Sequence, residues 1–209
     1  MLPALVPGWA QALYPKRIWK IPTDRKVLYL TFDDGPHPFI TPKVLDLLAQ
    51  YNAKATFFCI GDCIERSPSV FERIIQMGHA VGSHGYHHLN GWKTNVDSYI
   101  NDVFKAAEVI PSKLFRPPYG RLSSRQARSL ILNDFQIVMW TILSGDYDSK
   151  LSHKQCAKRV IENIEPGAIA LFHDSEKAEK NMFFALETVL KFASANGYIF
   201  EVIKQKGSA

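Results

Sequence analysis

The chain has 209 residues, of which 46% are hydrophobic, 22% charged and 12% aromatic, and it contains 12 glycines and 12 prolines. This balance excludes disordered, collagen-like and low-complexity chains, and the length favours a single domain around one core. The formal net charge is +5, but the Lys and Arg residues are scattered along the chain, so we expect a solvated basic surface and no nucleic-acid partner.

The first 25 residues show no pattern typical of an export signal or a transmembrane helix. Residues 1–14 carry no charged side chain, but they contain two prolines and a glycine, lack a basic start and are too short to span a bilayer. We predict that residues 1–25 form a segment packed on the main body, residues 26–209. The expected location is cytoplasmic, with association with the cell envelope or a membrane surface as the alternative.

Short apolar runs alternate with amphipathic stretches along the chain. The predicted strands are 27–31, 55–60, 80–81, 114–115, 136–141, 168–172 and 198–203, and the predicted helices are 41–50, 67–78, 96–110, 123–132, 153–164 and 179–193. Thr41 is the expected N-cap of its helix, with Pro42 at the first helical position. This alternation predicts a parallel sheet, in a barrel or an open doubly wound form, with the chemistry at the carboxyl ends of the strands.

The first predicted strand ends in two adjacent carboxylates, Asp33 and Asp34, followed by Gly35 and Pro36. In a regular strand these side chains would face opposite ways, but where a strand breaks into a turn both can reach one pocket. One carboxylate would then bind a metal ion and the other would act as a general base. The alternative is that Asp-Gly-Pro is a turn signal and nothing more.

Four of the seven histidines fall between residues 79 and 88. On a helical turn the spacing of His84 and His88 brings both imidazoles onto one face, as in zinc sites. With a carboxylate they would leave coordination positions open for water. The alternative is a loop histidine cluster without a metal, and His79 and His87 are expected to have structural or surface roles.

Five motifs, taken together and in this order, resemble those of the polysaccharide deacetylases, the NodB-homology family or carbohydrate esterase family 4. They are Thr31-Phe32-Asp33-Asp34-Gly35-Pro36, His84-x-x-x-His88, Arg116-Pro117-Pro118-Tyr119-Gly120, Gly145-Asp146-Tyr147 and Leu171-Phe172-His173. The resemblance runs from about Leu28 to Asp174. It implies an α/β fold, a distorted (β/α) barrel of about seven parallel strands like that of NodB, with residues 26–209 as the single catalytic domain.

The resemblance also implies a metal-dependent hydrolase. One divalent ion, Zn²⁺ in most members and otherwise Co²⁺ or another divalent ion, would be held by Asp34, His84 and His88. Asp33 would be the general base that takes a proton from the attacking water, and His173 would be the general acid that protonates the leaving amine.

Two further residues would support this acid and this base. By the same resemblance, Arg116 would orient Asp33 and keep it ionised, and Asp146 would pair with His173 and favour its protonated form.

The remaining motif residues would bind the substrate. Tyr147 and Leu171 would wall the pocket for the acetyl methyl group, and a backbone N–H near Tyr119, in the turn that also contains Pro118, would stabilise the tetrahedral oxyanion.

The chain departs from the family pattern at three positions. Gly85 stands where Ser or Thr is usual after the first histidine, so a hydroxyl that stabilises the loop is missing. Tyr147 replaces a common Trp, and Thr141 stands where an acidic residue is frequent. We expect Gly85 to leave the histidine pair less firmly held, and Tyr147 and Thr141 to reshape the sugar-binding groove. The ligands, the base and the acid are expected to stay in place.

The function implied is removal of N-acetyl groups from amino sugars of a polysaccharide or oligosaccharide. The expected partner is an N-acetylated glycan such as peptidoglycan, a chitin-like oligomer or an envelope polysaccharide, and the sequence does not predict the oligomeric state. Two alternatives remain open: an O-acetyl esterase on the same site, or a glycan-binding paralogue that has lost catalysis.

Overall fold

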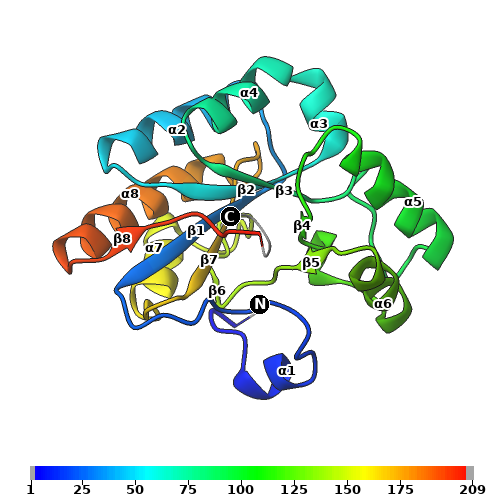
Figure 1. Cartoon of the computed structure of the whole chain (residues 1–209). Helices are drawn as coiled ribbons and strands as arrows, with labels where there is room; N and C mark the ends of the chain where they lie inside the picture. Colours follow the sequence, from blue (N-terminus) through cyan, green and yellow to red (C-terminus); the bar gives the residue numbers. More distant parts are fainter. Residues whose placement is uncertain (1–2, 206–209) are drawn as a thin grey trace.

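A curled, wholly parallel sheet forms the centre of the computed structural model, which describes residues 3–205 (Figure 1). The ends of the two predicted segments, residues 1–2 and 206–209, lie outside the described residues. The strand order is β5-β4-β3-β2-β1-β7-β6, and β8 pairs with the start of β1. The strands are β1 Val27–Asp33, β2 Ala55–Cys59, β3 Ala80–Ser83, β4 Leu114–Phe115, β5 Gln136–Ile137, β6 Ile142–Leu143, β7 Ile169–His173 and β8 Ile199–Phe200.

The helices surround the sheet and cover its outer side (Figure 1). They are α1 Gly8–Ala12, α2 Ile40–Gln50, α3 Gly61–Arg66, α4 Pro68–Gln76, α5 Val96–Ala107, α6 Ser124–Leu132, α7 His153–Ile161 and α8 Glu179–Ala195, with one 3-10 turn, η1, at Pro118–Gly120. None of the described helices is long and apolar enough to cross a membrane.

Strand β1 is the centre of the core. All seven of its residues are buried, because β2 and β7 flank it on either side and helices close the outer face. Phe32 stacks on Phe57 of β2 and on Phe172 of β7, with ring centroids 5.0 and 5.9 Å apart. Burial of such side chains stabilises the fold by roughly 1.5–3 kcal/mol each, and it fixes the place at which β1 ends.

The sequence prediction of an α/β fold with about seven parallel strands in a barrel-like sheet is confirmed. The predicted strand 136–141 is wrong in its length, since β5 ends at Ile137 and residues 138–141 form an irregular link to β6, which begins at Ile142. Within the link, Val138 N–H donates to the carbonyl of Phe115 on one side, and Met139 N–H donates to the carbonyl of Ile18 on the other. Helix α3 was not predicted.

The predicted N-cap of α2 is also wrong. The helix begins at Ile40, one residue before Thr41, so Pro42 is its third residue and not its first. The Thr41 hydroxyl accepts a hydrogen bond from the backbone N–H of His37 and donates one to the carboxylate of Asp174. It therefore ties the start of α2 to the end of β7.

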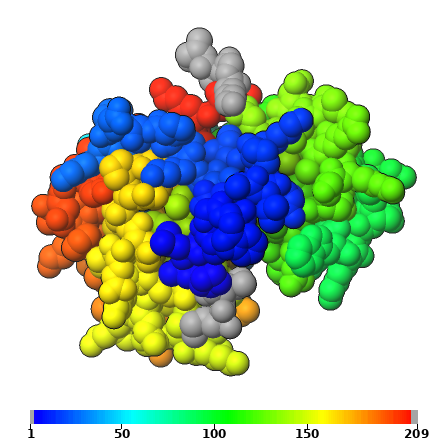
Figure 2. All heavy atoms as spheres, turned by 90° about the horizontal axis from the view of Figure 1, so that it is seen from below, coloured from blue at the N-terminus to red at the C-terminus, as the bar shows by residue number. Residues whose placement is uncertain are grey.

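The N-terminal segment lies at the bottom of the view in Figure 1. Seen from below, it covers the middle of that face, between the green part of the chain (about 100–140) and the yellow part (about 150–170) (Figure 2). Backbone bridges join Leu5 to Ile142 and Ile18 to Val138. The N–H of Ile21 donates to the carbonyl of Gly167 at 2.9 Å. This segment thus pairs with backbone beside β5, β6 and β7.

A substitution at Gly167 would measure how tightly the N-terminal segment packs on the sheet. Its φ is +82°, and a Cβ at this position would lie 2.0 Å from the carbonyl oxygen of Ile21, whereas Gly197 has a similar φ and open space around it. We expect Gly167→Ala to lower the free energy of unfolding by about 3 kcal/mol and Gly197→Ala by about 1 kcal/mol, the cost of the left-handed conformation alone. Urea unfolding measures both; equal losses would contradict the tight packing.

Candidate active site

Asp33 and Asp34 lie where β1 breaks into a turn at the carboxyl edge of the sheet. Asp33 is buried and Asp34 is partly exposed, with a φ of +81° that turns its side chain to the cleft. The turn is held by the buried Asp174, whose carboxylate accepts a hydrogen bond from the backbone N–H of Gly35 at 3.1 Å. Burial raises the pKa of Asp174 to about 7. The two neighbouring carboxylates therefore reach one site despite their adjacency in the chain.

Asp33 is held by the fully buried Arg116 after β4. The guanidinium donates to Asp33 Oδ1 and to the Thr31 hydroxyl, both at 2.8 Å, and to the carbonyl of Met139 at 2.8 Å. A buried ion pair of this geometry fixes the orientation of the carboxylate. The structure thus places Arg116 where the resemblance requires the group that orients the base.

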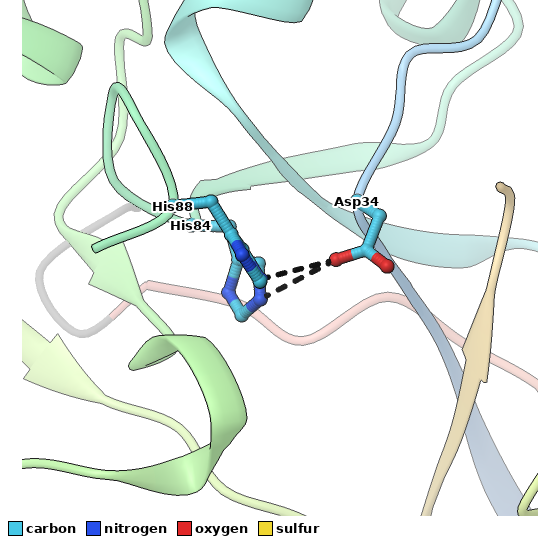
Figure 3. A group of neighbouring side chains, drawn as sticks. All are labelled: Asp34, His84 and His88. Atoms are coloured by element: carbon cyan, nitrogen blue, oxygen red, sulfur yellow. Dashed lines mark ion pairs between the residues drawn. The ribbon is translucent and has the colours of Figure 1, made fainter. Parts of the chain in front are cut away.

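Asp34, His84 and His88 converge on one point (Figure 3). One ligand atom from each lies within 4.8 Å of the other two, and His88 Nε2 is 3.3 Å from Asp34 Oδ1. Burial lowers the pKa of His84 to about 4, so its imidazole is neutral near pH 7. Burial alone would raise the pKa of Asp34, but the hydrogen bond from His88 and the nearby imidazoles outweigh it and hold that pKa well below its usual range. A carboxylate beside two imidazoles is a donor set that fits a divalent ion.

The ring orientation of His84 is consistent with a role as a metal ligand. Its Nδ1 lies 2.7 Å from the carbonyl oxygen of Arg116, which can only accept, so Nδ1 carries the proton and Nε2 offers a lone pair to the cleft.

The predicted helical turn at the histidine pair is wrong. Residues 84–88 follow β3 as a loop, with Gly85 at φ +79° and His88 at φ +57°. The two rings meet, with centroids 4.9 Å apart, because the loop folds back and not because of helical periodicity.

The loop is held by a carboxylate that the sequence did not single out. Asp102 of α5 is buried and accepts the backbone N–H groups of Tyr86 and His87, at 2.9 and 3.1 Å, and contacts His87 Nδ1 at 2.7 Å. A Cβ at position 85 would lie 2.9 Å from Asp102 Oδ2. The carboxylate of Asp102 therefore occupies the space that a side chain at position 85 would need, and it stabilises the loop in place of the missing hydroxyl.

His173, the last residue of β7, is paired with the fully buried Asp146. Asp146 Oδ1 lies 2.8 Å from His173 Nδ1, and its Oδ2 accepts the His173 backbone N–H at 2.8 Å. Burial alone would lower the pKa of His173, but Asp146 outweighs it and raises that pKa to about 9. His173 is thus protonated near pH 7, as a general acid must be.

These groups open onto one cavity of about 710 Å³, a size typical of small-molecule sites. Of the predicted substrate-binding residues, Tyr119, Tyr147 and Leu171 line it. Pro118 is buried beneath the turn and is not among the lining residues. Thr141 is also away from the cavity, since its hydroxyl donates to the carbonyl of Trp19. The expected effect of Thr141 on the groove is therefore not supported by its position.

Comparison with known proteins identifies the class to which the chain belongs. Residues 20–138 match the family model described as polysaccharide deacetylase. The chain belongs to this family, and the match begins within the N-terminal segment.

Individual relatives agree with this assignment. Two peptidoglycan-N-acetylglucosamine deacetylases of Bacillus cereus are 37% and 31% identical over 74% and 90% of the chain, and the matched regions cover 58% and 91% of those proteins. A crystal structure of a peptidoglycan N-acetylglucosamine deacetylase in complex with 4-naphthalen-1-yl-N-oxidanyl-benzamide has a TM-score of 0.84 and 32% identity, over 90% of this chain and 91% of that one.

The role of Asp102 can be measured through metal affinity. We expect Asp102→Asn to weaken Zn²⁺ or Co²⁺ binding about tenfold, because the loop that carries His84 and His88 loses its buried anionic acceptor. Asp97→Asn, on the exposed side of the same helix, removes the same charge and should leave the affinity unchanged. A metal titration of each variant gives the answer, and equal affinity in all three proteins would refute a positioning role for Asp102.

Proposed function

We propose that the chain is a metal-dependent hydrolase that removes N-acetyl groups from amino sugars of a glycan. One observation carries this proposal: Asp33, the Asp34–His84–His88 group and His173 all line the same cavity. These groups supply a base, a cation site and an acid within one small volume, which is the set that amide hydrolysis needs. The relatives named as peptidoglycan deacetylases support the same reaction.

Asp34, His84 and His88 would hold a divalent ion, Zn²⁺ or another. Such an ion, when bound, supplies a Lewis acid for a carbonyl oxygen and lowers the pKa of water. Asp33 lies beside this group, with Oδ2 3.8 Å from His84 Nε2, while its Oδ1 is occupied by Arg116. Asp33 Oδ2 is therefore the oxygen free to take the proton of the attacking water.

His173 completes the reaction from the other side of the cavity. Its Nδ1 donates to Asp146, so Nε2 is the atom that would give a proton to the leaving nitrogen. An amide nitrogen must gain a proton before the C–N bond breaks, and a histidine with a raised pKa holds that proton at neutral pH.

The turn at η1 offers a donor for the oxyanion. The N–H groups of Gly120 and Arg121 donate to the carbonyls of Pro117 and Pro118, whereas no partner is described for the N–H of Tyr119. We infer that this N–H stabilises the developing negative charge. Leu171 and Tyr147 line the cavity close to His173 and would accept the acetyl methyl group.

An O-acetyl esterase on the same site is the second candidate, because the base and the cation site serve esters equally. It differs in its dependence on His173, since an alkoxide leaving group needs less protonation than an amine. A glycan-binding paralogue without catalysis would bind glycans and release no acetate.

Acetate release from N-acetylglucosamine oligomers and from peptidoglycan tests the proposal. We expect chelator-treated protein to be inactive and to recover with Zn²⁺ or Co²⁺, and Asp33→Asn and His173→Ala each to lower kcat by about 10²- to 10⁴-fold. Hydrolysis of ester substrates alone, little affected by His173→Ala, would favour the esterase, and glycan binding without any release would overturn the proposal.

The pH profile tests the Asp146–His173 pair. The acid must be protonated, so kcat/KM falls as the pH rises through the pKa of His173. Because Asp146 raises that pKa, we expect Asp146→Asn to move the alkaline limb of the profile to lower pH by about one unit or more. Asp148→Asn should leave the limb in place, since the Asp148 carboxylate accepts the N–H of Lys150 and does not contact His173. An unchanged limb in Asp146→Asn would show that another group sets it.

A further inference from the structure

The cavity has a positively charged rim that the proposed reaction does not use. Arg121, directly after η1, and Lys177, just after β7, both line it. Among the described residues, neither side chain lies in an ion pair, and each contacts an aromatic ring instead: Arg121 lies over Trp92 at 5.1 Å and Lys177 over Tyr147 at 5.6 Å.

The carboxylates of the same cavity already have partners. Asp33 is paired with Arg116, Asp34 with His88, and Glu176 lies 3.3 Å from His37 Nε2. None of these contacts involves Arg121 or Lys177. The rim cations are therefore available for an anion that comes with the substrate.

The backbone that carries Arg121 is held in place by its neighbours. Its backbone N–H donates to Pro118 at 3.1 Å, and a Cβ at Gly91 would lie 2.4 Å from the carbonyl oxygen of Arg121, so the two loops are in close contact. The buried amide of Gln126 donates to the carbonyls of Gly91 and Thr94 on either side of Trp92. The loop bearing the Trp92 ring is thus fixed against the loop bearing the guanidinium.

A guanidinium that stacks on an aromatic ring keeps its N–H groups free to donate to a ligand. Arginine differs from lysine in that its planar fork matches the two oxygens of a carboxylate. Trp92 is 69% exposed and is not among the residues that line the cavity, whereas Arg121 is. The Arg121–Trp92 contact therefore joins a lining residue to the exposed surface, where a sugar that extends beyond the cavity would reach it.

We propose that Arg121 binds a carboxylate carried by the sugar next to the one that is deacetylated, and that Trp92 positions the Arg121 guanidinium. The substrate class is then an anionic N-acetylated glycan rather than a neutral one. This inference rests on the proposed deacetylase function and adds a specificity site to it.

Two matched substrates isolate the charge. One is an oligomer that alternates N-acetylglucosamine and N-acetylmuramic acid, and the other is the same oligomer with its lactyl carboxylates converted to methyl esters. With metal-loaded enzyme we expect kcat/KM to be about three- to tenfold higher for the free acid, through KM. Arg121→Ala should abolish this preference and leave the ester rate within about twofold of wild type, and Arg121→Lys should retain part of it.

Matched variants separate this role from general damage. Arg125→Ala removes an exposed cation of α6 outside the cavity lining and should keep the preference. Trp92→Ala should reduce the preference and Trp92→Phe should restore it, whereas Trp9→Ala, a tryptophan of similar exposure on α1, should have no effect.

Three results would overturn the inference: a wild-type enzyme with no preference, an Arg121→Ala variant that keeps the preference, or equal losses on both oligomers. If neither oligomer is hydrolysed, the proposed function fails, and calorimetric titration of the same proteins with the same two oligomers decides the inference separately. Tighter binding of the acid that depends on Arg121 would uphold it, and equal binding would reject it.

Discussion

The buried ion pair between Arg116 and Asp33 is the interaction on which the site depends. An arginine with no exposed surface is costly unless all of its donors are used, and this one reaches Asp33, Thr31 and the carbonyls of Val138 and Met139. These partners belong to β1 and to the link between β5 and β6. A single side chain therefore joins the centre of the sheet to its far side, and removal of either charge would leave the other buried without a partner.

Around this pair, three buried carboxylates fix the loops that carry the chemistry. Asp102 accepts the N–H groups of the histidine loop, Asp174 accepts the N–H of Gly35 beside Asp34, and Asp146 accepts the N–H of His173. In each case a carboxylate from one segment binds the backbone of another. Hydrogen bonds to buried carboxylates are strong and directional. They fix the positions of the loop residues as firmly as the backbone hydrogen bonds of the sheet fix those of the strands.

Local patterns in the sequence predicted the parts of the fold that depend on nearest neighbours. The apolar runs marked β1, β2 and β7 closely, because buried parallel strands are continuously hydrophobic. The ordered motifs also indicated which side chains meet at the carboxyl edge, although the helical reason given for His84 and His88 was wrong.

Contacts between distant segments could not be predicted in this way. Asp102 is one of several acidic residues on amphipathic helices, and no local pattern shows that its carboxylate caps a loop 15 residues earlier. Likewise, Gln136–Thr141 has the composition of one strand, and neither the end of β5 at Ile137 nor the pairing of the next residues with Ile18 is visible in it. Arg121 stands directly after a motif, yet its position over Trp92 depends on two loops meeting in space.

The pairing of the N-terminal segment with the region between β5 and β6 bears on how this protein behaves in solution. The sheet order has two ends, β5 and β6, and a strand at the end of a sheet offers unpaired N–H and C=O groups to other chains. Ala4, Val6 and Ile18 occupy such groups here, on Leu143, Thr141 and Ile137. The segment therefore covers the backbone groups at these ends of the sheet. A shortened protein that begins at residue 26 would expose them and would aggregate more readily.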